Sequence, residues 1–164
     1  MIIASRRRQF GFTLIELMMT VAIIGLLASI ALPMAELAVQ RSNEQGLRSA
    51  LREIRTALDA YHQAIEDGRI QGGGRSLSGY PETLQTLVDG VPEARSPDGK
   101  AKVYFLRRIP RDPFFVDPAA TDDETWGKRS YVSSADEPAE GEDVFDVYSQ
   151  AEGVGLNGIA YRKW

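Results

Sequence analysis

The sequence predicts an α+β fold in which one long N-terminal helix packs on a small antiparallel β-sheet. Three observations support this prediction: an apolar run over residues 12–32, a following stretch with helical apolar spacing, and short aromatic and β-branched segments after glycine- and proline-rich connections. The 164 residues are enough for a membrane-length helix and one small domain, so we expect no second domain.

The first element is the apolar run from Phe12 to Leu32, whose 21 residues contain a single charge, Glu16. As an α-helix rising about 1.5 Å per residue, this run spans roughly the 30 Å of a bilayer's hydrocarbon core. A carboxylate there is unfavourable by about 2.5–3.5 kcal/mol at the centre and by less near the headgroups, so it either snorkels or has a partner. Glu16 is therefore a candidate functional residue in a transmembrane or assembly helix.

The flanking charges predict the orientation of this helix. Three arginines at positions 6, 7 and 8 precede it, and the next basic residue is Arg41. By the positive-inside rule, we expect residues 1–11 to face the cytoplasm and the rest of the chain to be exported. A secretory signal peptide cut near Ser29-Ile30-Ala31 is the alternative, but its apolar core is usually about 7–15 residues long and uncharged.

The helix is expected to continue past Pro33, where the missing backbone donor and a clash with the preceding turn predict a kink or local unwinding. Apolar residues then recur at intervals of 3 and 4 while charged residues occupy the other positions. The apolar stripe consists of Leu47, Leu51, Ile54, Leu58, Tyr61 and Ile65. It predicts an amphipathic continuation over residues 33–67, covered by the remaining residues 68–164.

Residues 68–164 are expected to form the globular part. Gly68 and the glycines at positions 72–74 end the long helix and begin a loop. Residues 80–88 have the pattern of a short helix with Pro81 in its first turn. Strand candidates for an antiparallel sheet of about three strands follow at residues 103–106, 130–133 and 144–148. Trp126 is expected in the core, because large aromatic side chains bury most of their area.

The residues at the start of the apolar run resemble a known processing signal. Gly11-Phe12-Thr13-Leu14-Ile15-Glu16, after a basic leader, is similar to the prepilin signal of type IV pilins and type II secretion pseudopilins. The resemblance implies that a prepilin peptidase cuts between Gly11 and Phe12 on the cytoplasmic side and methylates the new Phe12 amine. Glu16 lies about one helical turn from that amine. In a bundle of identical helices, its carboxylate can neutralise the Phe12 amine of a neighbouring subunit.

Three later segments, residues 80–88, 106–114 and 145–149, are similar to the GspG-type major pseudopilin of type II secretion. The resemblance implies a type IV pilin-like fold and a subunit of the bacterial inner membrane, with a periplasmic C-terminal domain, that polymerises into a periplasmic filament. It also implies partners: further copies of the chain, minor pseudopilins, the prepilin peptidase, and an inner-membrane platform with a secretion ATPase. The chain has no cysteine, which agrees with a pseudopilin, because many type IV pilins close a C-terminal loop by a disulfide.

Major pseudopilins of this kind usually hold calcium in an aspartate-rich C-terminal loop. The corresponding residues 150–159 offer only Glu152 as a carboxylate and Asn157 as a side-chain amide. Calcium usually takes about six to eight oxygens, two or more of them from carboxylates. Glu152 and Asn157 are therefore candidate calcium ligands in a set that needs further oxygens.

The composition argues against several other classes. The formal net charge is −4 and would become −7 without the three leader arginines, which does not favour nucleic acid as a partner. The only histidine is His62, and without cysteine there is no thiol nucleophile or zinc cluster, so we expect a protein that is not an enzyme. Two alternatives stay open: a type IV pilus subunit for adhesion, motility or DNA uptake, and a membrane-tethered periplasmic binding module.

Overall fold

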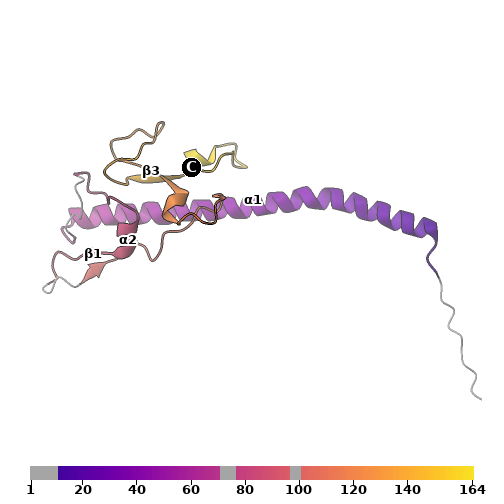
Figure 1. Cartoon of the computed structure of the whole chain (residues 1–164), viewed down its shortest axis with the longest axis horizontal. Helices are drawn as coiled ribbons and strands as arrows, with labels where there is room; N and C mark the ends of the chain where they lie inside the picture. Colours follow the sequence, from indigo (N-terminus) through magenta and orange to yellow (C-terminus); the bar gives the residue numbers. More distant parts are fainter. Residues whose placement is uncertain (1–10, 71–76, 97–100) are drawn as a thin grey trace, which may run out of the picture. The chain divides into compact units, whose positions relative to one another are not determined.

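The computed structural model describes residues 11–70, 77–96 and 101–164 (Figure 1). The predicted leader arginines and the glycines at positions 72–74 lie outside these described residues. The chain divides into two compact units, Met1–Gln40 and Arg41–Trp164. Helix α1, Leu14–Glu66, contributes residues to both units.

In the first unit, α1 is made mainly of leucine, isoleucine, methionine and alanine, most of which are good helix formers. Pro33 lies inside α1, which is α-helical on both sides of it. The local unwinding that Pro33 allows is therefore not found, whereas a bend at this residue stays a prediction. Every described residue from Gly11 to Val39 is exposed within the chain.

In the second unit, the predicted apolar stripe of α1 forms the centre of the core. Five of its six members are buried and the sixth, Ile65, is half-buried. The buried members are Leu47, Leu51, Ile54, Leu58 and Tyr61. Three alanines on the same side, Ala50, Ala57 and Ala64, are buried as well and let other segments approach the helix closely.

Helix α1 ends where the glycine signal predicts. Gly68 has a φ of 64°, a left-handed conformation that glycine adopts without a Cβ penalty. Its N–H donates to Ile65 O at 2.9 Å, and the Arg69 N–H donates to Ala64 O at 2.9 Å. These bonds satisfy carbonyl groups of the last helical turn.

The short helix after the loop is shorter than predicted. Helix α2 covers Gln85–Asp89, and Leu84 and Leu87 are buried against the core. Pro81 does not lie in its first turn, so that part of the prediction is wrong. Pro81 is buried in a bend before the helix, and its main-chain oxygen accepts a hydrogen bond from the Val144 N–H at 2.7 Å.

The strands form two small antiparallel pairs instead of one sheet of three. Strand β1, Val91–Pro92, pairs with β2, Lys102–Val103, and β3, Trp126–Arg129, pairs with β4, Asp146–Ser149. Figure 1 shows the C-terminal part of α1 between β1 and β3. Two short 3₁₀ turns complete the unit: η1 at Asp123–Thr125 and η2 at Tyr161–Lys163. The α+β prediction is confirmed, with both pairs packed around α1.

Residues 130–133, predicted as a strand, form a turn. The Ser133 N–H donates to Ser130 O, and the Tyr131 N–H donates to a carboxylate oxygen of Asp143 at 2.8 Å. A side chain therefore takes the place of a strand partner. Strand β3 lies just before this turn and begins at Trp126. The burial predicted for Trp126 is confirmed, and its indole Nε1 donates a hydrogen bond to Pro110 O at 2.7 Å.

The other two strand candidates are only partly strands. Of residues 103–106 only Val103 belongs to β2, because the N–H groups of Phe105 and Leu106 both donate to Leu87 O in α2. The candidate at residues 144–148 begins too early, because the Val144 N–H bonds to Pro81 O and ladder pairing with β3 starts at Asp146.

Candidate functional site

The first turn of α1 carries a capping box formed by Thr13 and Glu16. The Thr13 hydroxyl accepts a hydrogen bond from the Glu16 N–H at 3.3 Å. In return, Glu16 Oε2 accepts hydrogen bonds from the N–H and the hydroxyl of Thr13, both at 3.3 Å. These bonds use backbone donors that a helix start leaves without partners, and they keep the Glu16 carboxylate at the positive end of the helix dipole.

The predicted cleavage residues lie immediately before this turn. Gly11 and Phe12 are outside α1 and exposed, and the Phe12 side chain is 84% exposed. The structure therefore brings Gly11, Phe12 and Glu16 to one end of α1. The capping role of Thr13 was not predicted, although Thr-x-x-Glu before an apolar run is the pattern of a capping box.

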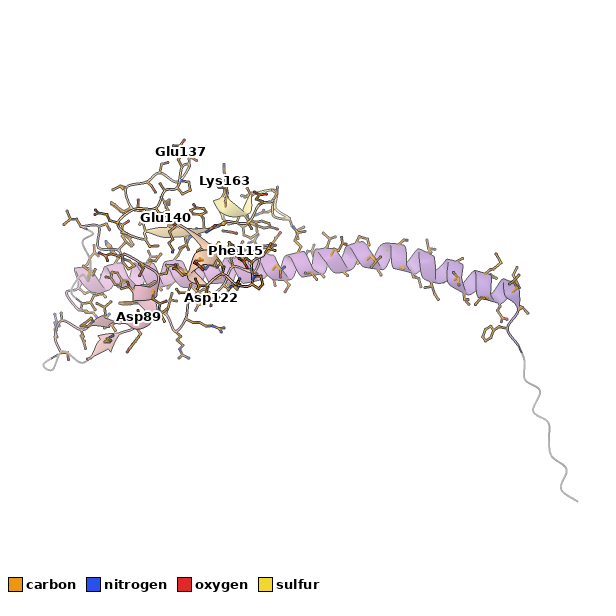
Figure 2. The ribbon with its side chains drawn as sticks, viewed as in Figure 1. Asp89, Phe115, Asp122, Glu137, Glu140 and Lys163 are labelled. Carbon is orange, nitrogen blue, oxygen red and sulfur yellow. The ribbon has the colours of Figure 1, made fainter. Side chains whose placement is uncertain are left out.

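The apolar surface that follows is unusually large. The most apolar 18-residue window of α1 has a mean hydropathy of 2.3, and none of its residues is buried. Helix α1 is therefore long and apolar enough to cross a membrane. Figure 2 shows the side chains of this stretch projecting from α1 on all sides. The 16 large apolar side chains from Phe12 to Val39 are 47–84% exposed. At about 1.5–3 kcal/mol for each fully buried side chain, removal of this surface from water is worth tens of kcal/mol.

The candidate calcium ligands do not form a metal site by themselves. Glu152 and Asn157 are both exposed, and Asn157 Oδ1 accepts a hydrogen bond from the Ile159 N–H at 3.0 Å. Across the described parts of the chain, no three histidine, aspartate or glutamate side chains are grouped so that they could hold a metal ion.

The single histidine has a packing role in the structure. His62 is half-buried on α1, and its ring stacks on Tyr80 with ring centres 4.6 Å apart. Burial, followed by the nearby Asp59 carboxylate, raises the pKa of the Tyr80 phenol above its ordinary value of 10.0. Tyr80 in turn packs edge-on against Phe145, so this cluster joins α1 to the segment before β4.

Glu44 and Asp112 are two of the three buried carboxylates among the described residues, the third being Asp143, and the sequence did not predict their burial. Glu44 is 5% exposed and Asp112 is 1% exposed. Each accepts hydrogen bonds from segments distant in the chain, Glu44 from Leu156 and Asp112 from Ser149. These two long-range bonds have no local sequence signal, because Leu156 and Ser149 are brought near only by folding.

Comparisons with known proteins agree with the site at the start of α1. Residues 6–32 match the family model of the prokaryotic N-terminal methylation motif. The motif, the exposed apolar helix and the α+β unit together define a pilin-like subunit, a class of protein that forms multi-subunit filaments. No solved structure matches the chain.

The relatives narrow this class. The chain is 34% identical to type II secretion system core protein G of Klebsiella pneumoniae over 118 residues, which are 68% of this chain and 73% of the relative. It is 30% identical to core protein G of Aeromonas hydrophila over 112 residues, 66% of this chain and 70% of the relative. The type IV major fimbrial protein FimA of Dichelobacter nodosus is 44% identical, over 50% of this chain and 48% of its own. The chain belongs to the core protein G family of type II secretion systems and is a GspG-type pseudopilin.

Proposed function

We propose that the chain is a nonenzymatic structural subunit that polymerises into a periplasmic pseudopilus and so serves protein export through a type II secretion system. One observation carries this proposal: the membrane-length run of residues 12–32 has an exposed apolar surface on all sides and a single carboxylate, Glu16, near its start. Such a surface needs either lipid or other copies of the same helix. A pseudopilin uses both in turn, lipid before assembly and neighbouring subunits afterwards.

Processing is the first step of the proposed function. A prepilin peptidase would cut between Gly11 and Phe12 at the cytoplasmic face and methylate the new Phe12 amine. The methylation motif over residues 6–32 and the exposure of both residues support this step. The cut would leave a positive charge about one helical turn from Glu16.

Pairing between subunits is the second step. Before assembly the Glu16 carboxylate is occupied by Thr13 of its own helix, which gives it hydrogen bonds but no opposite charge. In the filament, the Phe12 amine of a neighbouring subunit would supply that charge. An unpaired ion buried among apolar helices costs several kcal/mol, so the pairing would select one register between adjacent helices.

Assembly would move the first unit from lipid into the filament core. The three leader arginines support an orientation in which residues 1–11 are cytoplasmic and the unit Arg41–Trp164 is periplasmic. Helix–helix contacts would then replace lipid contacts, and a bend at Pro33 would help the helices pack. An inner-membrane platform with a secretion ATPase would supply the work of extraction, and minor pseudopilins would join the filament.

The test is the variant Glu16→Leu, produced in cells that assemble filaments from the unmodified chain. We expect normal membrane insertion and cleavage but no filaments, because the Phe12 amine loses its partner. Immunoblots of the processed chain and electron microscopy measure the two steps separately. Glu36→Leu, the same change at another exposed position of α1, is the matched control and should leave filaments intact.

Normal filaments from Glu16→Leu would contradict the pairing step. Mass spectrometry of the mature chain tests processing, because the N-terminus must be a methylated Phe12. A mature chain that keeps its arginine-rich start would instead favour a membrane-tethered periplasmic module that does not polymerise.

A type IV pilus subunit is the second candidate, favoured by the 44% identity to FimA. That similarity covers only 50% of this chain, whereas the similarity to core protein G of Klebsiella pneumoniae covers 68% of it. Surface filaments in a strain without secretion genes would favour the pilus. A secretion defect on deletion of this gene, restored by the unmodified chain, would favour the pseudopilus.

A further inference from the structure

The C-terminal loop, residues 153–164, is attached directly to α1 by the buried side chain of Glu44. Glu44 Oε1 accepts a hydrogen bond from the Leu156 N–H at 2.7 Å and another from the Tyr161 hydroxyl at 3.2 Å. Glu44 is 5% exposed, and the two donors lie 112 and 117 residues further along the chain. A single carboxylate therefore holds both the tip and the base of this loop.

Two arginines on the same face of α1 extend the attachment. Arg48 lies one turn beyond Glu44, with its guanidinium carbon 4.3 Å from the ring centre of Trp164. Arg55 lies two turns further and donates from Nη2 to Trp164 O at 2.8 Å and to Val147 O at 3.1 Å. The spacing 44, 48 and 55 places all three side chains on one stripe of the helix, directed at the loop and at β4.

The loop also closes on itself through main-chain hydrogen bonds. The Gly155 N–H donates to Ile159 O at 2.9 Å, and Val154 and Ala160 form an antiparallel bridge. A Cβ at Gly155 would lie 2.3 Å from the Trp164 ring, so this close approach requires glycine. The Tyr161 ring stacks on Phe114 with ring centres 4.3 Å apart, and Lys163, labelled in Figure 2, lies in the η2 turn that ends the loop.

The calcium ion that the family resemblance implies for this loop does not fit these residues. Calcium prefers about six to eight oxygens, with two or more from carboxylates. Glu152 is the only carboxylate between residues 150 and 164, and Asn157 Oδ1 already accepts the Ile159 N–H. The main-chain oxygen of Ile159 is also occupied, because it accepts from the Gly155 N–H and from Trp164 Nε1 at 3.1 Å.

We propose that Glu44, with Arg48 and Arg55, fastens the C-terminal loop in place of a calcium ion, so that the second unit folds and stays folded without calcium. Helix α1 supplies the Glu44 carboxylate, an anion that accepts hydrogen bonds from the loop. In a calcium site, the loop would instead surround a cation. This inference concerns the isolated subunit and does not depend on filament assembly. Its failure would therefore leave the proposed pseudopilus function intact.

The first test measures thermal unfolding of the full chain in detergent by near-ultraviolet circular dichroism, with calcium chloride or with the chelator EGTA. We expect the Tm to agree within about 1 °C in the two buffers. A ligand that binds the folded state raises Tm, so bound calcium would separate the two values. A Tm that rises with calcium, or saturable calcium binding by titration calorimetry, would overturn the proposal.

The second test removes the Glu44 carboxylate by Glu44→Ala, which leaves the Leu156 N–H and the Tyr161 hydroxyl without this acceptor. We expect Tm to fall by about 5–10 °C in both buffers. Hydrogen exchange of peptides within residues 153–164 should accelerate at least about tenfold, while peptides of β3 change much less. Glu53→Ala, the same change at an exposed position of α1, should leave both measurements unchanged.

Two conservative variants keep the test decisive if Glu44→Ala does not fold. Glu44→Gln retains an acceptor but loses the charge, so its Tm should lie between those of the unmodified chain and Glu44→Ala. Tyr161→Phe removes only the hydroxyl and should lower Tm by about 2–5 °C. Unchanged Tm and unchanged loop exchange in both variants would contradict the role of Glu44.

Discussion

The two units of the chain differ in where their apolar side chains find partners. In Met1–Gln40 the large apolar side chains from Phe12 to Val39 are exposed, whereas in Arg41–Trp164 the apolar stripe of α1 is buried by segments of the same unit. Both sets of side chains belong to one α-helix. The second unit therefore obtains its stability within the chain, and the first requires a membrane or further subunits.

The carboxylates of α1 show the same difference. Glu16 is exposed, and among the described residues its carboxylate bonds only to Thr13, three positions earlier. Glu44 is buried and bonds to Leu156 and Tyr161 from the other end of the chain. A carboxylate that is satisfied locally remains available for an outside partner, and one that is satisfied by distant segments is part of the fold.

The largest expected effect comes from truncating matched apolar residues in the two units. Leu58 is fully buried in the second unit, so Leu58→Ala should lower the free energy of unfolding by about 2–5 kcal/mol through the cavity it leaves. Ile24 is exposed in the first unit, so Ile24→Ala should change the subunit's unfolding by less than about 0.5 kcal/mol. Chemical denaturation of the detergent-solubilised full chain measures both.

Ile24→Ala, which should have little effect on subunit stability, should have a clear effect on filament yield. Ile24→Ala should reduce the amount of filament recovered from cells, because it removes contact area that only other subunits provide. If Ile24→Ala destabilised the isolated subunit as much as Leu58→Ala does, the division into an internally satisfied unit and an externally satisfied unit would be wrong.

A medium effect is expected at Asp112, the most buried carboxylate described in the second unit. Its Oδ2 accepts from the Ser149 hydroxyl at 2.5 Å and its Oδ1 accepts from the Phe114 N–H at 2.8 Å. Asp112→Asn replaces one acceptor by a donor and should cost about 1–3 kcal/mol in urea unfolding. Asp136→Asn, at an exposed position, is the control and should stay within about 0.5 kcal/mol. Equal stabilities of the two variants would contradict the role given to Asp112.

The smallest effect is expected at Glu124, whose pKa is lowered from its ordinary value of 4.5 by hydrogen bonds from the N–H and the hydroxyl of Thr121. A lowered pKa in the folded state stabilises the fold above the unfolded pKa, and this contribution disappears as the pH falls through the folded pKa. Nuclear magnetic resonance titration should show Glu124 protonating below an ordinary glutamate. Thr121→Ala should move the pKa partly back upward, and a Glu124 pKa above 4.5 would contradict the assignment.

The sequence by itself determined the features that depend on neighbouring residues. The spacing of Leu47 to Tyr61 predicted the buried face of α1, because helical periodicity places such residues on one side whatever covers them. Gly68 predicted the helix end, since its left-handed φ is a local property. The pattern from Gly11 to Glu16 predicted the N-terminal methylation motif, because that motif lies in one short contiguous segment.

Only the tertiary structure decided the features that depend on distant partners. Residues 130–133 have strand-forming side chains, yet β3 lies just before them, because β4 pairs there and the Asp143 carboxylate takes the Tyr131 N–H. Glu44 looks like any charged helical residue until Leu156, 112 residues later, is brought against it. Neighbouring residues make too few contacts to determine where a short strand begins or whether a carboxylate is buried. The partners of both are therefore set by the folded core.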